Sequence, residues 1–232
     1  MGNWTKFEFG RDTLPSRCYL FAGDITEERK NSILSLYENV EFHKQTVYER
    51  YIVSNGTKED LLLFQVYGAS TISDLSYILK DGGVEEIIFI GTAYGIEKGI
   101  EIGSYVIPNK VQALEGLLKV VFDVDYTKPN KLVTQKIKNA LDINNEIYIE
   151  GKSVSVPSTF FQPPKDKLDV DNIALEMEFS SISYLSEKLG MKCGGILIIS
   201  DNEEHSLLED KTLVYKKWIN SFKILKKHFD KF

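Results

Sequence analysis

Short, almost uniformly apolar runs alternate along this chain with longer segments of helical periodicity. The first run, Cys18–Ala22, leads through a polar turn into a helix expected over about residues 26–40. Ile87–Ile90 is apolar at every position. That pattern is typical of a central parallel strand covered on both faces, because a half-exposed strand would alternate with polar residues.

The remaining segments continue this alternation. Asn55 and Gly56 predict a hairpin turn, because both residues tolerate positive φ. The flanking strands are expected near 47–54 and 61–67, further strands near 105–107, 146–155 and 195–200, and helices near 71–79, 131–140, 173–189 and the C-terminus. The pattern favours one α/β domain over residues 1–232, with a mixed, mostly parallel central sheet and helices on both faces.

Composition agrees with one large core and narrows the possible ligands. The 232 residues are 43% hydrophobic and 27% charged, which suits a single continuous core. The formal net charge of −6 argues against a nucleic-acid surface, which would need clustered Lys and Arg. Basic residues between 216 and 227 fall at helical spacing among apolar ones and are expected on a solvated helix face. Any nucleotide-like ligand should therefore be small.

The cysteines and the N-terminal residues bear on location and on metal binding. Cys18 and Cys193 each lie in an apolar run and are expected as buried, inert thiols, so we predict no metal site and no disulfide. Met1–Gly10 lacks the apolar stretch of a signal peptide, and no segment approaches 18 uninterrupted apolar residues. We expect a cytoplasmic protein without a membrane partner.

Polar and glycine-rich residues follow four of the predicted strands. In an open α/β sheet, ligands bind beyond the carboxyl ends of strands, where glycines let backbone N–H groups approach an anion. Taken singly, a glycine after a strand is more often ordinary turn chemistry. The four ends are Gly23-Asp24, Gly68-Ala69-Ser70, Gly91-Thr92-Ala93-Tyr94-Gly95 and Ser200-Asp201-Asn202.

The segment Leu175-Glu176-Met177-Glu178 lies within the helix expected over 173–189. Two residues apart on a helix, the carboxylates would point about 200° from one another. If the helix were covered on both sides, the two carboxylates could not both face solvent, so one of them would point into a cleft. Alternatively, Glu176 and Glu178 are ordinary solvated carboxylates.

Four segments together resemble a known family. Gly91–Gly95 followed by Ile102–Pro108 is similar to the family's glycine-rich turn and the strand after it, and Leu175–Glu178 followed by Ser200–Asn202 is similar to its Val-Glu-Met-Glu segment and its Ser-Asp strand end. The family is the nucleoside phosphorylases of the purine and uridine type, which also includes methylthioadenosine nucleosidase and AMP nucleosidase. The resemblance covers nearly the whole chain, from about Gly23 to Phe222.

The resemblance implies roles for the acidic segment and for Asp201. Glu176, Met177 and Glu178 would lie under the sugar, with Glu178 gripping the 2′- and 3′-hydroxyls and Met177 packing on the ribose. A carboxylate suits a diol because charge-assisted acceptors hold it while the ring flattens. Asp201 matches the general acid that protonates a purine leaving group, a role that needs a raised pKa. Uridine-cleaving members lack this aspartate, which favours a purine substrate.

Further positions carry over with the resemblance. Lys211 aligns with an arginine that assists the acid, and Lys216 is an alternative. Phe160 matches the aromatic that stacks on the base; from the sequence alone, a residue filling the core under its proline loop, Pro157–Pro164, is equally compatible. Gly23 and Thr92 match backbone and hydroxyl donors at the phosphate site.

This chain departs from the family at the phosphate site. The arginines that hold phosphate in the phosphorylases align here with Glu27 and Phe89, and neither replaces a guanidinium. Arg29 does not obviously replace them, because it lies about 200° from Glu27 around the same predicted helix, on the opposite side. An arginine that some members donate from a neighbouring subunit corresponds to Arg50. A partner-donated histidine near the N-terminus has no counterpart.

Three functions remain open on the sequence. One is a purine nucleoside phosphorylase with a rebuilt phosphate site, taking inorganic phosphate as co-substrate and no other cofactor. The second is a nucleosidase that uses water. The third is a nucleoside-binding protein without turnover. The resemblance also implies a homo-oligomer, a dimer or a trimer of dimers.

Overall fold

A computed structural model describes residues 3–23, 25–43, 48–160, 164–206 and 211–231. Its strands form one mixed sheet in the order β10-β6-β8-β9-β5-β1-β4-β3-β2, with β7 on β6. A further pairing between β10 and β5 closes β5, β10, β6, β8 and β9 into a ring. The strands are β1 Arg17–Ala22, β2 Asn39–His43, β3 Glu49–Asn55, β4 Lys58–Val66, β5 Glu86–Gly95, β6 Tyr105–Ala113, β7 Tyr126–Thr127, β8 Tyr148–Ser155, β9 Asn172–Glu176 and β10 Lys192–Asp201.

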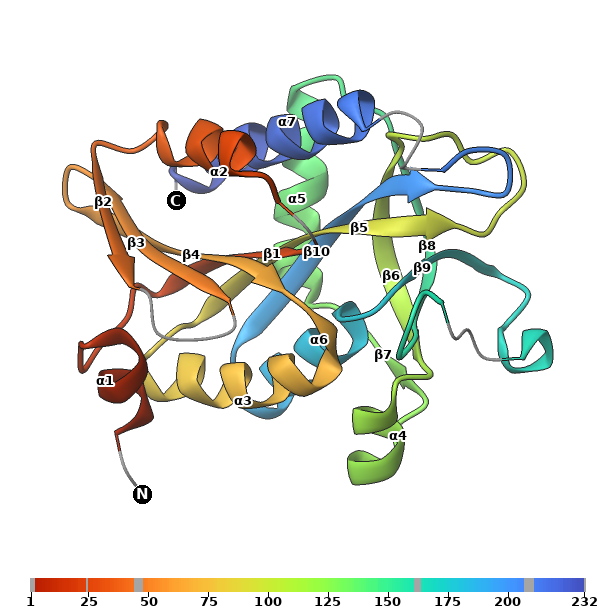
Figure 1. Ribbon diagram of the computed structural model, residues 1–232, viewed down its shortest axis with the longest axis horizontal. Coiled ribbons are helices and arrows are strands. Elements are labelled where there is room, and N and C mark those ends of the chain that lie inside the picture. Colours follow the sequence, from red (N-terminus) through yellow and green to blue (C-terminus); the bar gives the residue numbers. More distant parts are fainter. Residues whose placement is uncertain (1–2, 24, 44–47, 161–163, 207–210, 232) are drawn as a thin grey trace.

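Helices cover both faces of the sheet (Figure 1). α2, α5 and α7 lie on one face, and α1, α3 and α6 lie on the other. None of the helices in the described ranges is both long and apolar enough to cross a membrane. The helices are α1 Trp4–Phe9, α2 Glu27–Leu34, α3 Gly68–Asp81, α4 Gly116–Phe122, α5 Lys131–Ile143, α6 Phe179–Lys188 and α7 Thr212–Phe229, with a 3₁₀ turn at Lys165–Lys167.

The central strands are parallel and buried on both faces, as their uniform apolar runs predict. β5 lies between β1 and β10 and is parallel to both. Side chains alternate between the faces. Phe89 packs in the cluster under α3 and α6, whereas Ile88 and Ile90 pack in the cluster under α5 and α7. The α/β class and the central parallel strands are confirmed.

The hairpin is also confirmed. β3 and β4 pair antiparallel, with Asn55 opposite Lys58, and Gly56 between them takes φ of +61°. The helix expected over 26–40 is too long. α2 ends at Leu34, because Asn39–His43 pairs with β3 as an edge strand.

The helix expected over 173–189 is wrong in its first part. Asn172–Glu176 is strand β9, and α6 begins only at Phe179. β9 lies between β8 and β5, with Leu175 paired to both Val154 and Tyr94. Its pairing with both neighbours overrides a pattern that also suits a helix. Glu176 and Glu178 therefore do not project from one helix.

Two smaller expectations are settled by burial. Cys18 and Cys193 are buried free thiols within strands. Lys216, Lys223 and Lys227 are exposed on α7, but Lys226 is buried, pairs with Asp230 at 2.7 Å and lies over the Tyr37 ring. The solvated-face prediction is thus wrong for Lys226.

Candidate functional site

The carboxyl ends of the parallel strands β1, β4, β5 and β10 bring the predicted glycine-rich and polar turns to one edge of the sheet. Gly23 follows β1 with φ of +95°, and a β-carbon there would lie 3.2 Å from the Thr92 hydroxyl on β5. The bare backbone of Gly23 and the hydroxyl of Thr92 therefore face one another, as an anion cradle requires. Asp24 lies outside the described residues.

Glu178, just before α6, contacts the turn that joins β4 to α3. The N–H of Gly68, the first residue of α3, donates to Glu178 Oε1 at 2.7 Å. Gly68 has φ of +74°, which glycine adopts without the steric cost of a β-carbon. Glu178 thus lies at the N-terminus of a 14-residue helix, where the helix dipole favours a negative charge.

The carboxylate of Glu176 holds the turn that precedes α6. Its carboxylate accepts the N–H groups of Glu178 at 2.6 Å and Phe179 at 2.5 Å, and it also accepts the Ser155 hydroxyl. These contacts satisfy the first N–H groups of α6. Glu176 is 3% exposed and is committed to holding the turn that carries Glu178.

Both carboxyls have raised pKa values. Burial raises the pKa of Glu178 to about 8, and the neighbouring charge of Glu176 adds to the effect. Burial likewise raises the pKa of Glu176 to about 7, although hydrogen bonds from Ser155, Phe179 and Glu178 favour its ionised form. A titratable pair near neutral pH is typical of functional sites, although structural networks produce it too.

Asp201 ends β10 and lies opposite Tyr94 of β5. The Ser200 hydroxyl lies 2.6 Å from Asp201 Oδ2 and 3.3 Å from the carbonyl of Ala93. The next residue, Asn202, joins two loops. Its Nδ2 donates to the Ile100 carbonyl at 2.8 Å, and its Oδ1 accepts the N–H groups of Glu204 and His205. Sequence patterns assign no role to Asn202, because Ile100 lies in a separate loop from Glu204 and His205.

Met177 lies between Glu176 and Glu178 in the chain. Its side chain is half-buried against the cluster of Val154, Val156 and Leu175. Tyr94 packs on the same cluster. Met177, which is predicted to pack on the sugar, and Tyr94, near the end of β5, therefore share one apolar floor.

Phe160 and Lys211 lie apart from this floor. Phe160 is 92% exposed on the loop after β8, so it does not fill the core, and residues 161–163 of that loop lie outside the described residues. Lys211 is exposed at the N-terminus of α7, next to residues 207–210, which are likewise outside the described part. Lys216 is exposed on α7. The roles predicted for Phe160 and Lys211 stay predictions.

The two positions that align with phosphate-binding arginines carry no positive charge. Phe89 is fully buried, and its ring centroid lies 5.0 Å from that of Phe179. Glu27 forms an ion pair with the buried Lys30 ammonium at 2.6 Å, and the same ammonium pairs with Glu49 at 2.5 Å. Two carboxylates thus surround one ammonium.

Neither arginine considered as a substitute is available. Arg29 stacks on the Tyr215 ring of α7. Arg50 is fully buried in its own chain, where Nη1 donates to Glu8 Oε2 at 2.6 Å and the guanidinium lies over the Phe9 ring. The expectation that Arg50 is donated to a neighbouring subunit is therefore wrong for this conformation, because a fully buried side chain does not reach another molecule.

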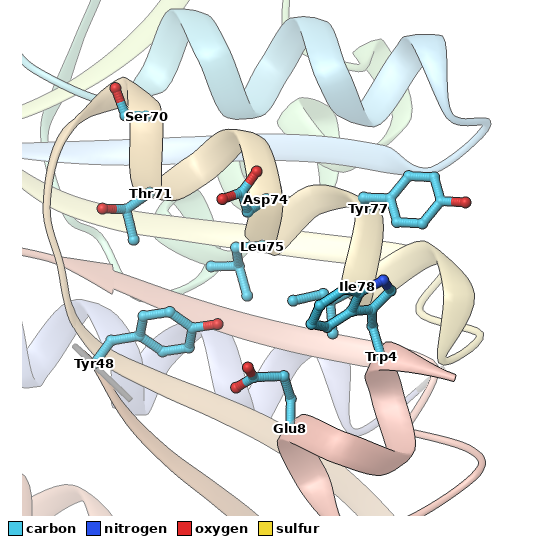
Figure 2. Close-up of a pocket in the computed structure, with 9 residues that line it drawn as sticks. All are labelled: Trp4, Glu8, Tyr48, Ser70, Thr71, Asp74, Leu75, Tyr77 and Ile78. Atoms are coloured by element: carbon cyan, nitrogen blue, oxygen red, sulfur yellow. The ribbon is translucent and has the colours of Figure 1, made fainter. Parts of the chain in front are cut away.

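A cavity of about 640 Å³ lies beside the Glu8–Arg50 pair, between α1, α3 and the start of β3 (Figure 2). Figure 2 shows Tyr48 and Glu8 facing the side chains of α3 across it. Ser70 lines this cavity, although it belongs to one of the predicted glycine-rich turns. A second cavity, of about 460 Å³, lies between the loops 95–102 and 202–205, next to Asp201. Within the described ranges, no cluster of three or more His, Cys, Asp or Glu could hold a metal ion.

Solved structures share this fold. A Campylobacter jejuni 5′-methylthioadenosine/S-adenosyl homocysteine nucleosidase matches with a TM-score of 0.78 at 16% identity, over 94% of this chain and 100% of that chain. A mutant futalosine hydrolase of Helicobacter pylori matches with a TM-score of 0.76 at 17% identity, over 94% of this chain and 100% of that chain. The purine nucleoside phosphorylase of Toxoplasma gondii, in complex with immucillin-H, matches with a TM-score of 0.74 at 17% identity, over 92% of this chain and 90% of that chain.

Sequence comparison is more decisive about family. A search of curated protein sequences found no match. The family model of the phosphorylase superfamily, however, matches residues 22–229, which include the turns at Gly23, Thr92, Glu178 and Asp201. By this match the chain belongs to the phosphorylase superfamily.

Proposed function

We propose that this protein cleaves the N-glycosidic bond of a purine nucleoside and that water, rather than phosphate, is the nucleophile. The observation that carries the choice of water is the charge around the turn after β1. Glu27 and Glu49 surround Lys30, and Phe89 is buried against Phe179. Among the described residues of this turn, no cation is left over for a phosphate, whereas water needs none.

The buried lysine does not supply the missing charge. Burial disfavours the charged form of Lys30, but hydrogen bonds to Glu27 and Glu49 outweigh burial and leave its pKa raised. The ammonium therefore stays charged, and two carboxylates already neutralise it. A phosphate brought to this turn would meet a net negative group of side chains.

The other residues would act on the nucleoside itself. Glu178 would accept the ribose hydroxyls, Met177 would pack on the sugar, and Asp201 would protonate the purine as the C–N bond breaks. Burial raises the pKa of Glu178 to about 8, and hydroxyl donors from a diol would favour its ionised form. The similarity in fold to two hydrolases, the nucleosidase and futalosine hydrolase named above, is compatible with this choice.

Phosphorolysis is the second candidate, and one observation favours it. The open backbone of Gly23, where a β-carbon would lie 3.2 Å from the Thr92 hydroxyl, could hold an anion without an arginine. Neutral hydrogen bonds are roughly half as strong as charge-assisted ones, so phosphate would bind weakly.

The experiment incubates the protein with inosine and adenosine in the presence and absence of phosphate and identifies the sugar by ³¹P and ¹H NMR. We expect free ribose, formed at the same rate with and without phosphate. Asp201→Asn is the control for contaminating enzymes and should slow cleavage on the order of 10²–10⁴-fold. Ribose 1-phosphate formed only with phosphate would instead establish phosphorolysis. Nucleoside binding without either product would establish a binding protein.

A further inference from the structure

Tyr94 occupies a singular place in the sheet. It is the residue of β5 at which both neighbouring strands reach their ends, because it pairs with Leu175 of β9 on one side and with Asp201 of β10 on the other. Glu176 and Glu178 follow Leu175 directly in the chain. Tyr94 therefore lies between the predicted sugar-binding segment and the predicted proton donor.

The side chain of Tyr94 lies on the floor of the site. Its ring is half-buried against the cluster of Val154, Val156 and Leu175, on which Met177 also packs. Side chains alternate along a strand, so Tyr94 projects from the same face of β5 as Thr92, two residues earlier. The ring thus shares its apolar cluster with Met177 of the sugar-binding segment and lies on the same face of β5 as the Thr92 side chain.

The Tyr94 hydroxyl is available to a ligand. It makes no hydrogen bond to any of the residues that the structure describes. The nearby polar side chains are already engaged: Ser200 lies against Asp201, and Asn202 holds the loops on either side. A half-buried phenol without a protein partner offers one donor and acceptor together with an apolar ring face.

We propose that Tyr94 is a specificity-determining residue that forms a wall of the nucleobase subsite and limits the size of the base. The inference rests on the proposed function, because it takes Glu178 as the sugar group and Asp201 as the proton donor. A base joined to the sugar and protonated by Asp201 must span the interval between the two strand ends. Tyr94 lies in that interval, so its ring contacts the base and excludes bulky substituents.

The test compares the parent protein with Tyr94→Phe and Tyr94→Ala, using adenosine, inosine and the bulkier N6-benzyladenosine. We expect Tyr94→Ala to raise kcat/KM for N6-benzyladenosine relative to adenosine at least about tenfold, the scale at which pocket contacts discriminate between substrates. Tyr94→Phe keeps the ring and should keep this size selectivity. If the hydroxyl contacts the base, the same variant changes the ratio of inosine to adenosine.

A matched control separates selectivity from stability. Tyr184 is also half-buried, on α6, and its ring packs against Phe122 at 5.2 Å. Tyr184→Ala removes a comparable side chain and should leave the ratios of kcat/KM unchanged. Circular dichroism and Tm identify variants that fail to fold. Unchanged size selectivity in a folded Tyr94→Ala would overturn the proposal.

A failure of the proposed function would be distinguishable. If the parent protein cleaves no nucleoside, binding of adenine and hypoxanthine is measured by calorimetry. Weaker binding of these bases in Tyr94→Ala, but not in Tyr184→Ala, would support the base subsite without catalysis. Equal binding in all variants, or no binding to the parent protein, would overturn it.

Discussion

At the residue scale, the two glutamates of one short segment take different parts because their surroundings differ. Glu176 has three donors around its carboxylate, two from the turn that follows and one from Ser155. The carboxylate of Glu178 accepts the N–H of Gly68, across the sheet edge. We infer that Glu176 positions the turn and that Glu178 is the group left to meet a ligand.

The first prediction concerns stability against pH. In the unfolded chain both carboxyls titrate near 4.5, but in the folded protein their pKa values are about 7 and about 8. The folded state therefore holds more protons between these limits. Its free energy of unfolding should fall as the pH rises from about 4.5 to about 8, and these two groups should cause no further loss above that range.

Urea unfolding at a series of pH values measures this fall. Glu178→Gln keeps an oxygen that can accept the Gly68 N–H but removes the titration, so its stability should fall less steeply with pH. A parallel change in the parent protein and the variant would assign the pH dependence to other groups. The same variant should weaken riboside binding, since each charge-assisted contact contributes about 1.5–3 kcal/mol.

At the element scale, the start of α6 depends on a side chain from the strand before it. A helix leaves its first N–H groups without internal partners, and Glu176 supplies the acceptor for two of them. The helix itself packs through Phe179, Ile182 and Leu185 into the core shared with α3. The cap and the packing together place Glu178 against Gly68.

Glu176→Ala should therefore destabilise the fold and weaken nucleoside binding together. The lost acceptor leaves buried donors unpaired, at a cost of about 1–3 kcal/mol, which lowers Tm by roughly 2–4 °C for each kcal/mol. Glu176→Gln retains one acceptor oxygen and should lose less stability and less nucleoside affinity than Glu176→Ala. Calorimetry of unfolding measures the loss of stability, and calorimetry of nucleoside binding measures the loss of affinity. A variant with normal stability but no nucleoside binding would show that Glu176 contacts the ligand directly.

At the scale of the whole molecule, the proposed choice of water as the nucleophile rests on charge. The chain has a formal net charge of −6, and the turn after β1 adds its own negative group. Arg29 and Arg50 are held elsewhere, by Tyr215 and Glu8. The fold thus keeps the architecture of its superfamily, while Arg29 serves packing and Arg50 an ion pair.

Glu27→Arg should tighten phosphate binding about tenfold, because it replaces a repelling carboxylate by a charge-assisted donor. Glu28→Arg is the matched control. It makes the same charge change in the same turn of α2, about 100° round the helix. Calorimetry at low ionic strength measures both, and added salt should reduce the gain. An equal gain from the two variants would show that Glu27 does not face the anion site.

The sequence by itself determined the order of most elements and the buried parallel strands, because uniform apolar runs at strand length report burial directly. It also determined the family, since the turns at Thr92, Glu178 and Asp201 occur in a characteristic order. Local patterns say less about β9, whose five residues are compatible with a helix until β8 and β5 pair with them.

Only the tertiary structure decided which side chains are free to meet a ligand. Arg50, Lys30 and Glu176 are charged in the sequence but are committed to partners that are distant in the chain or on another element. Tyr94 lies between the ends of β9 and β10 because long-range pairing joins three separate segments. Such commitments depend on contacts between remote residues, which no local pattern of hydrophobic and polar positions specifies.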